Sequence, residues 1–144
     1  MDFAKTFIEK NFFLICENAI LDEKGLVSLI KIFDTIHAKK LPGIRPQLTF
    51  VANLSVQELS KKEEKITMSI KLISPSGKEM KFLDVTRKIK RKKQQSQNEG
   101  LIMDVSGIQF LEFGQYKALL NVNGKALAGL SFYLEKRARD KNGK

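Results

Sequence analysis

The sequence predicts an all-β protein, an antiparallel immunoglobulin-like or Greek-key β-sandwich of about eight strands. Apolar and polar residues alternate along several segments, most cleanly over residues 66–72, and this period of two separates the faces of a strand. Tight-turn sequences such as Asn123-Gly124 separate these segments. The spacing Glu112-x-Gly114-x-Tyr116 before the last hairpin is typical of the tyrosine corner of immunoglobulin-like sandwiches.

The N-terminal part of the chain is expected to lead into a first hairpin. Residues 2–10 can form a short helix with Phe3, Phe7 and Ile8 on one side, although a strand-like or disordered start fits as well. Residues 12–20 predict a central strand and residues 26–33 its partner. The turn between them contains Gly25.

The middle of the chain predicts a long connection followed by three strands. Residues 34–46 contain three turn-forming residues, Pro42, Gly43 and Pro46, and we expect them to connect the sheets. Strands are predicted over residues 47–56, 66–72 and 78–84. A capping box at residues 55–58 favours a helical turn, and residues 61–65 favour an exposed loop.

The C-terminal part predicts further strands after a long polar segment. Residues 86–100 are interpreted as a basic loop, since Ile89 is almost their only apolar residue. Strand segments are expected at residues 101–105 and 108–111, broken at Ser106-Gly107. Residues 116–122 and 126–134 then form the last predicted hairpin.

A chain of 144 residues has the ordinary size of one domain. We expect an N-terminal segment over residues 1–11, a single sandwich over residues 12–135 and a basic, flexible tail over residues 136–144. Charges interrupt the N-terminus too often for a secretory signal, and the apolar run over residues 12–16 is too short to span a membrane. The expected location is therefore the cytoplasm.

The net charge of +10 is concentrated in two places. Six of the seven residues from 87 to 93 are basic, and the tail carries the remaining excess. Clustered lysine and arginine can bind a phosphate backbone or another polyanion. The alternative is a solvated loop whose charges protect strand edges. The predicted polyanion-binding residues are Arg87, Lys88, Lys90, Arg91, Lys92 and Lys93.

No catalytic, cofactor-binding or metal-binding signature is present, so we predict a protein that is not an enzyme and holds no cofactor or metal. Cys16 and His37 are the only cysteine and histidine, which is too few for the familiar zinc sites. Cys16 is expected to be a small buried apolar residue. The carboxylates Glu17, Asp34 and Asp104 lie in apolar surroundings, and we favour structural roles for them over acid–base chemistry.

A spaced motif opens the predicted sandwich and consists of Cys16, Glu17, Asn18, Ala19, Asp22, Gly25, Ser28, Leu29, Ile30, Ile32, Phe33 and Asp34. Further short motifs follow in the segments 74–78, 113–116 and 123–125. Together these motifs resemble an uncharacterised bacterial family of small β-rich domains, and the similarity covers residues 12–134. The resemblance implies a β-rich bacterial or phage-associated domain and supplies no catalytic residues.

Two functional hypotheses lead, ahead of a third, an unrecognised enzyme with a carboxylate site at Glu17, Asp34 and Asp104. The first is a non-enzymatic interaction module that binds another protein through a sheet edge or end loops, because the scaffold carries long polar connections and no reaction centre. The second is an accessory protein that binds nucleic acid or another polyanion through the predicted basic loop. The oligomeric state cannot be read from these patterns.

Overall fold

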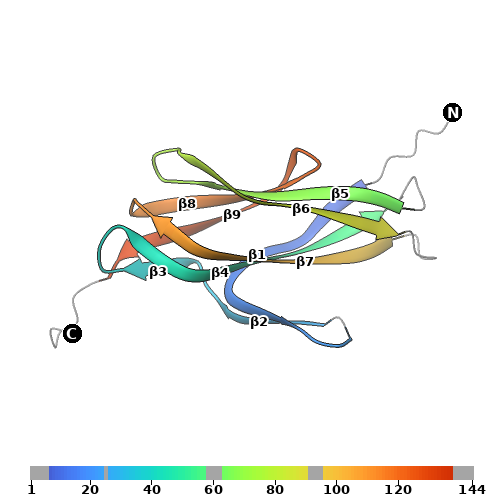
Figure 1. The fold of residues 1–144 in the computed structure, drawn as a ribbon, viewed down its shortest axis with the longest axis horizontal. Helices are drawn as coiled ribbons and strands as arrows, with labels where there is room; N and C mark the ends of the chain where they lie inside the picture. The colour runs from blue at the N-terminus through green and yellow to red at the C-terminus, as the bar shows by residue number, and fades with distance from the viewer. Residues whose placement is uncertain (1–6, 25, 58–62, 91–95, 138–144) are drawn as a thin grey trace.

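The computed structural model describes residues 7–24, 26–57, 63–90 and 96–137, which form two packed β-sheets (Figure 1). The expected all-β sandwich is therefore confirmed. The described residues contain nine strands, one more than expected, and no helix. Their bounds are β1 Phe7–Leu21, β2 Val27–Ile32, β3 Thr35–Ala38, β4 Gly43–Gln57, β5 Glu63–Ile73, β6 Glu79–Lys90, β7 Ser96–Phe110, β8 Gly114–Val122 and β9 Lys125–Lys136.

Sheet A contains four strands in the order β2-β1-β4-β7, all antiparallel. Sheet B contains five strands in the order β3-β9-β8-β5-β6. Four of these strands are antiparallel neighbours, whereas β3 pairs with β9 in parallel through Thr35–Ala38 and Tyr133–Lys136. Strand β3 was not predicted, since its four residues lie within the segment interpreted as a connection.

The core lies between the sheets and is built from alternate residues of each strand. The inward faces predicted for residues 66–72 and 116–122 are confirmed, since Ile66, Ile70, Tyr116 and Leu120 are at most 1% exposed. Phe50 of β4 contributes the facing wall of sheet A and is fully buried. Period-two alternation was sufficient to identify these positions because a strand sends successive side chains to opposite faces.

The predicted turns form with the expected backbone geometry. Asn123 and Gly124 both have positive φ, 51° and 82°, as the two central residues of a type I′ hairpin require. Gly77 closes the turn between β5 and β6 with φ 91°, and the Gly77 amide donates to the Ser74 carbonyl at 2.9 Å. The tyrosine-corner hydrogen bond is also present, from Tyr116 Oη to the Glu112 carbonyl.

The predicted N-terminal helix is wrong over residues 7–10, the part of it that the structure describes. Residues 1–6 lie outside the described part of the chain, and β1 already begins at Phe7. Phe7–Lys10 pairs with Leu54–Gln57 of β4. Sheet pairing therefore supplies the backbone partners that a helix would otherwise provide. The capping box at residues 55–58 fails for the same reason, because β4 continues through Gln57.

The predicted loop over residues 86–100 is also corrected. Residues 86–90 belong to β6 and residues 96–100 to β7, which leaves only residues 91–95 outside the described structure. Ile89 supplies the reason for β6, since its side chain is 1% exposed and anchors the charged strand to the core. The break expected at Ser106-Gly107 is only a local irregularity, with Gly107 at φ 68°, inside one continuous strand.

Other boundaries differ from the expectation because pairing extends the strands beyond their alternating segments. Strand β4 starts at Gly43, four residues earlier than predicted, where it pairs with Phe110. Strand β5 starts at Glu63, within the segment expected to be a loop, and pairs there with Lys90. A strand can thus contain charged residues if its backbone is paired.

Candidate functional site

One side of the sandwich is an open edge between β1 and β9. Strand β2 pairs with β1 only from Cys16 onward, and β3 pairs with β9 only from Tyr133 onward. Within the described ranges, residues 7–14 of β1 and 125–132 of β9 therefore have a paired neighbour on one side alone. The two strands contact one another across the sheets. We call this region the open side; it combines two unpaired strand edges.

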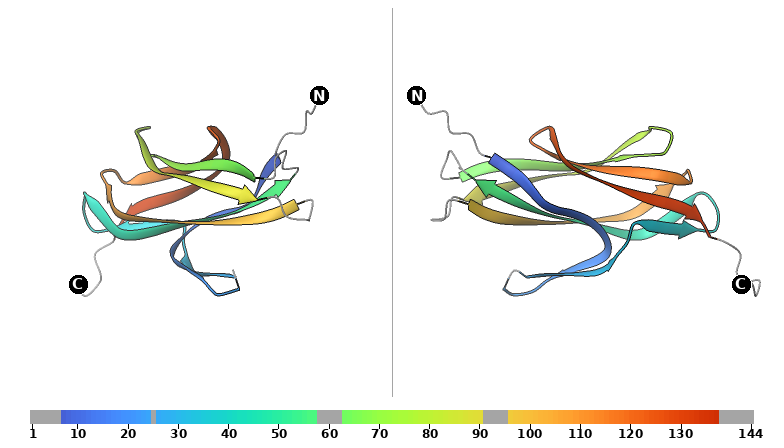
Figure 2. Two further views of the ribbon diagram at one scale, coloured as in Figure 1. Left: turned by 45° about the vertical axis from the view of Figure 1, so that its right-hand side comes forward. Right: turned by 180° about the vertical axis from the view of Figure 1, so that it is seen from behind.

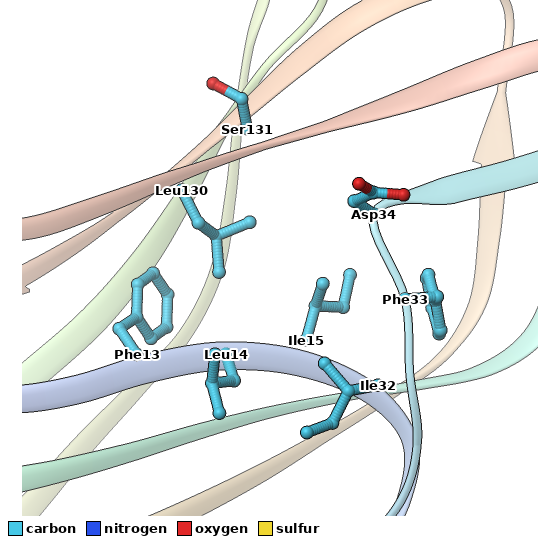
Figure 3. A pocket seen from close by; sticks show the side chains of 8 residues that line it. All are labelled: Phe13, Leu14, Ile15, Ile32, Phe33, Asp34, Leu130 and Ser131. Atoms are coloured by element: carbon cyan, nitrogen blue, oxygen red, sulfur yellow. The ribbon is translucent and has the colours of Figure 1, made fainter.

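A pocket of about 380 Å³ lies at the open side. Figure 3 shows Leu130 of β9 facing Phe13 and Ile15 of β1, with Asp34 at one end of the gap. Asp34 Oδ1 accepts a hydrogen bond from Thr35 Oγ1 at 3.0 Å. Asp34 is the only titratable side chain among the described residues that line the pocket. An apolar groove beside exposed backbone suits a side chain of an added strand better than proton transfer.

A second cavity lies where the β1–β2 hairpin folds over the outer face of sheet A. The hairpin leaves the sandwich and lies below β4 and β7 in Figures 1 and 2. Thr49 and Val51 point away from the core, yet they are only 0% and 2% exposed. Leu21 and Val27 of the hairpin line a cleft of about 380 Å³ together with Val51. We call this cavity the hairpin cleft.

The hairpin cleft has a polar corner formed by Asn53, Asn98 and Arg87, and Asn11 is the hydrogen-bond partner of both asparagines. Asn11 Nδ2 donates to Asn53 Oδ1 at 2.6 Å and to Asn98 Oδ1 at 3.2 Å, which joins β1, β4 and β7. The Arg87 guanidinium donates to the Gly100 carbonyl, and Gly100 is the register partner of Asn53. Sequence reasoning missed this group because 42 and 87 positions separate Asn11 from its partners.

The six predicted polyanion-binding residues do not form one loop. Arg87 lies opposite the buried Ile66 in the β5–β6 register and turns toward β7. Lys88 and Lys90 are exposed residues of the same strand, and Lys88 lies directly opposite Lys65. The predicted residues Arg91, Lys92 and Lys93 lie outside the described residues. The Arg87 side chain thus points to the opposite face of β6 from that of Lys88.

The candidate carboxylates have individual structural partners. Asp104 Oδ1 accepts from Thr49 Oγ1 at 2.7 Å. Glu17 Oε2 of β1 lies 3.5 Å from Lys31 Nζ of β2. Asp34 lies at the end of the pocket on the open side. These side-chain contacts of Glu17, Asp34 and Asp104 are thus made to three different residues, and Thr49 Oγ1 also lies 3.4 Å from the Glu17 carbonyl oxygen.

Cys16 is a buried thiol, as expected. Its side chain is 0% exposed, and Sγ donates to the Asn18 carbonyl at 3.3 Å. Burial raises the pKa of the Cys16 thiol, and the charge of Asp104 adds to this effect. His37 is exposed on β3 in the other sheet. A thiol in this environment is a poor nucleophile.

Neither a metal site nor a membrane-spanning helix is found in the described ranges. Among these residues, no group of three or more histidine, cysteine, aspartate or glutamate side chains could hold a metal ion. The same part of the chain contains no helix with the length and apolar character needed to cross a bilayer.

Comparison with solved structures gives a distant similarity of fold. One similar structure is a Pseudomonas fluorescens alkylpurine DNA glycosylase, AlkC, bound to DNA containing an abasic site analog. It shares 9% sequence identity with a TM-score of 0.49, over 89% of this chain and 30% of the glycosylase chain. The chain thus spans about a third of the length of that enzyme.

Comparison with protein sequences identifies the family. No curated protein matches this sequence. A family model does match, over residues 11–135, which covers most of the chain and nearly all of the two sheets. The resemblance to an uncharacterised family of β-rich domains is therefore confirmed. The chain belongs to the family of unknown function DUF6941.

Proposed function

We propose that this domain is a non-enzymatic module of the bacterial cytoplasm that binds another protein by accepting an extended segment along β9. The observation that carries the proposal is the open edge of β9 over residues 125–132, beside an apolar pocket. Main-chain hydrogen bonds to such an edge provide affinity, and a pocket for alternate side chains provides specificity.

The position of β3 supports β9 as the receiving strand. β3 pairs with the outer edge of β9 from Tyr133 to Lys136. A segment added beside residues 125–132 would therefore pair with the rest of the same edge. The amide of Tyr133 donates to the Asp34 carbonyl at 2.8 Å and therefore points toward this edge. Because backbone groups alternate along a strand, the amides of Gly129 and Ser131 point the same way.

The other edge of the open side is less suited to pairing. The β1–β4 register shifts between Lys10 and Phe12, which marks an irregularity in β1. Such a bulge twists a strand and hinders further pairing. The pocket lies beyond this irregularity, between Ile15 and Leu130, where a side chain of the added segment can enter. We therefore expect the partner to present alternating apolar residues.

The buried thiol supports the proposed location. Cys16 is the only cysteine, and it is fully buried and free. A fold that is stabilised by its apolar core without a disulfide is typical of reducing compartments. The family resemblance described above supports the bacterial origin.

A proline at position 131 tests the strand-addition proposal. Partners captured from a native lysate are to be identified and the interacting segment made as a synthetic peptide. Ser131→Pro removes the outward amide and leaves the side chain away from the core, whereas Ser131→Ala keeps the amide and is the matched control. We expect Ser131→Pro to lower peptide affinity by at least about tenfold, because the amide of residue 131 can no longer donate to the peptide and the proline ring disturbs the pairing beside it. Equal affinity of a folded Ser131→Pro variant would contradict the proposal.

A second candidate function is binding of a polyanion through the exposed lysines of β5 and β6. Lys65 lies directly opposite Lys88 in the register, so two positive charges lie close together on the outer face of sheet B. The test is a salt titration of duplex DNA with a Lys65→Gln, Lys88→Gln, Lys90→Gln variant. A triple variant of the exposed Lys10, Lys24 and Lys125 is the control.

The salt dependence separates this function from a general effect of net charge. We expect the first variant to lower the slope of log affinity against log salt by about one for each phosphate that it no longer neutralises. The control variant, which removes the same charge elsewhere, should keep the slope of the wild type. Equal slopes for both variants would exclude a specific role of β5 and β6.

A further inference from the structure

The hairpin cleft has the composition of a small-molecule site. Its volume of about 380 Å³ lies within the usual range for such sites, about 300–1,000 Å³. Apolar side chains from three strands and the hairpin form most of its wall, among them Phe12, Leu21, Val27, Val51 and Ile102. This wall favours an apolar ligand body, because each apolar group transferred from water contributes to affinity.

The polar corner of the cleft favours an anionic group. Arg87 is the only charged side chain among the described residues that line the cleft. Its guanidinium carries five N–H donors, and the bond to the Gly100 carbonyl uses one nitrogen of the fork. The remaining donors match the planar geometry of a carboxylate.

The asparagines add to this donor character. The Oδ1 atoms of Asn53 and Asn98 both accept hydrogen bonds from Asn11. What these two side chains can offer a ligand is therefore chiefly their amide N–H groups. Both residues line the same cleft as Arg87, so three side chains with N–H donors line a cavity whose other side chains are apolar.

We propose that the hairpin cleft binds a small aliphatic carboxylate, with its chain between the β1–β2 hairpin and the outer face of sheet A and its carboxylate at Arg87. The site is separate from the open side between β1 and β9, since the two cavities share no lining residue. It therefore stands whether or not the proposed strand addition occurs.

Calorimetric titration with sodium decanoate tests this site. Decanoate, kept below its micelle concentration, should bind the wild type saturably with one molecule per chain. Decanol retains the chain and lacks the charge. We expect decanol to bind about 10-fold or more weakly than decanoate, because it lacks the charge-assisted hydrogen bonds of the carboxylate. Absence of saturable decanoate binding, or equal affinity for decanol, would overturn the proposal.

Two variants locate the bound decanoate. Arg87→Gln should weaken decanoate by about 10-fold and decanol by less than about twofold, whereas Lys125→Gln, which removes an exposed charge from β9, should change neither. Gly100→Phe should abolish binding of both ligands. A Cβ at Gly100 meets no atom within 4 Å, so the ring can enter the cleft without distorting β7. The Gly100→Phe substitution also keeps the backbone carbonyl to which Arg87 donates. It therefore tests the site even if Arg87→Gln impairs folding. Unchanged decanoate affinity in Gly100→Phe would overturn the proposal.

Discussion

Tyr116 Oη donates a hydrogen bond of 2.7 Å to the backbone carbonyl of Glu112, four residues earlier in the chain. The Tyr116 ring is buried between two phenylalanines. It makes an edge contact with Phe110, at a centroid distance of 5.2 Å, and stacks on Phe132 at 5.4 Å. One side chain therefore connects the turn before β8 to the core formed by both sheets.

Replacing Tyr116 with phenylalanine should destabilise the domain by about 1–2 kcal/mol, because the partly buried Glu112 carbonyl loses its donor while the ring packing stays. Urea unfolding followed by circular dichroism measures the change in the free energy of unfolding. Tyr133→Phe is the control, since Tyr133 is 41% exposed. Equal stability of the Tyr116→Phe variant and the wild type would show that the hydrogen bond contributes nothing.

Glu112 should make stability depend on pH in the acid range. A hydrogen bond from Ser76 Oγ, at 2.7 Å, lowers the pKa of the Glu112 carboxyl from its ordinary value of 4.5, and Ser74 acts in the same direction. The folded state thus favours the ionised carboxylate. This contribution is present above the unfolded pKa and is lost as pH falls through the lower folded pKa.

Thermal unfolding between pH 6 and pH 2 therefore measures the role of Glu112. We expect Glu112→Gln to flatten the decline of Tm below about pH 4.5, relative to the wild type. Glu135→Gln removes an exposed carboxylate from β9 and serves as the control. A decline of unchanged steepness in Glu112→Gln would mean that other carboxylates cause the acid sensitivity.

Two glycines with positive φ should respond differently to alanine. Gly124 has φ 82° and open space around it, so Gly124→Ala should cost about 1 kcal/mol, from backbone strain alone. Gly114 has φ 130°, and an added Cβ would lie 3.0 Å from Pro75 Cγ. Gly114→Ala should therefore cost more, about 2–4 kcal/mol, from strain plus steric overlap. Chemical denaturation of both variants would refute this order if Gly124→Ala proved the more harmful.

Cys16 should react with thiol reagents only when the fold opens. Its side chain is fully buried, and burial raises the pKa of its thiol above the ordinary value of 9.0, which lowers the thiolate fraction. We expect the native protein at pH 8 to be labelled by a disulfide reagent about 100-fold or more slower than in 8 M urea, because an opening step must come first. Labelling at comparable rates in both conditions would place the thiol at the surface.

Local sequence patterns were sufficient for much of this fold. Alternation over residues 66–72 and 116–122 predicted the buried faces of β5 and β8 because strand geometry fixes the side to which each residue points. Asn123-Gly124 predicted a hairpin because few residue pairs adopt two positive φ angles readily. The corner formed by Tyr116 was predicted from a spacing of four residues.

Tertiary structure decided which edges are open and which distant residues meet. Thr86 to Lys90 looks like a loop by composition, yet pairing with β5 and burial of Ile89 make it a strand. The short parallel strand β3 and the open edge of β9 depend on pairing between residues about 100 positions apart. Asn11, Asn53 and Asn98 likewise converge only when β1, β4 and β7 lie side by side. Short-range patterns reflect backbone geometry, whereas both candidate sites arise from pairing between distant segments, which no local spacing specifies.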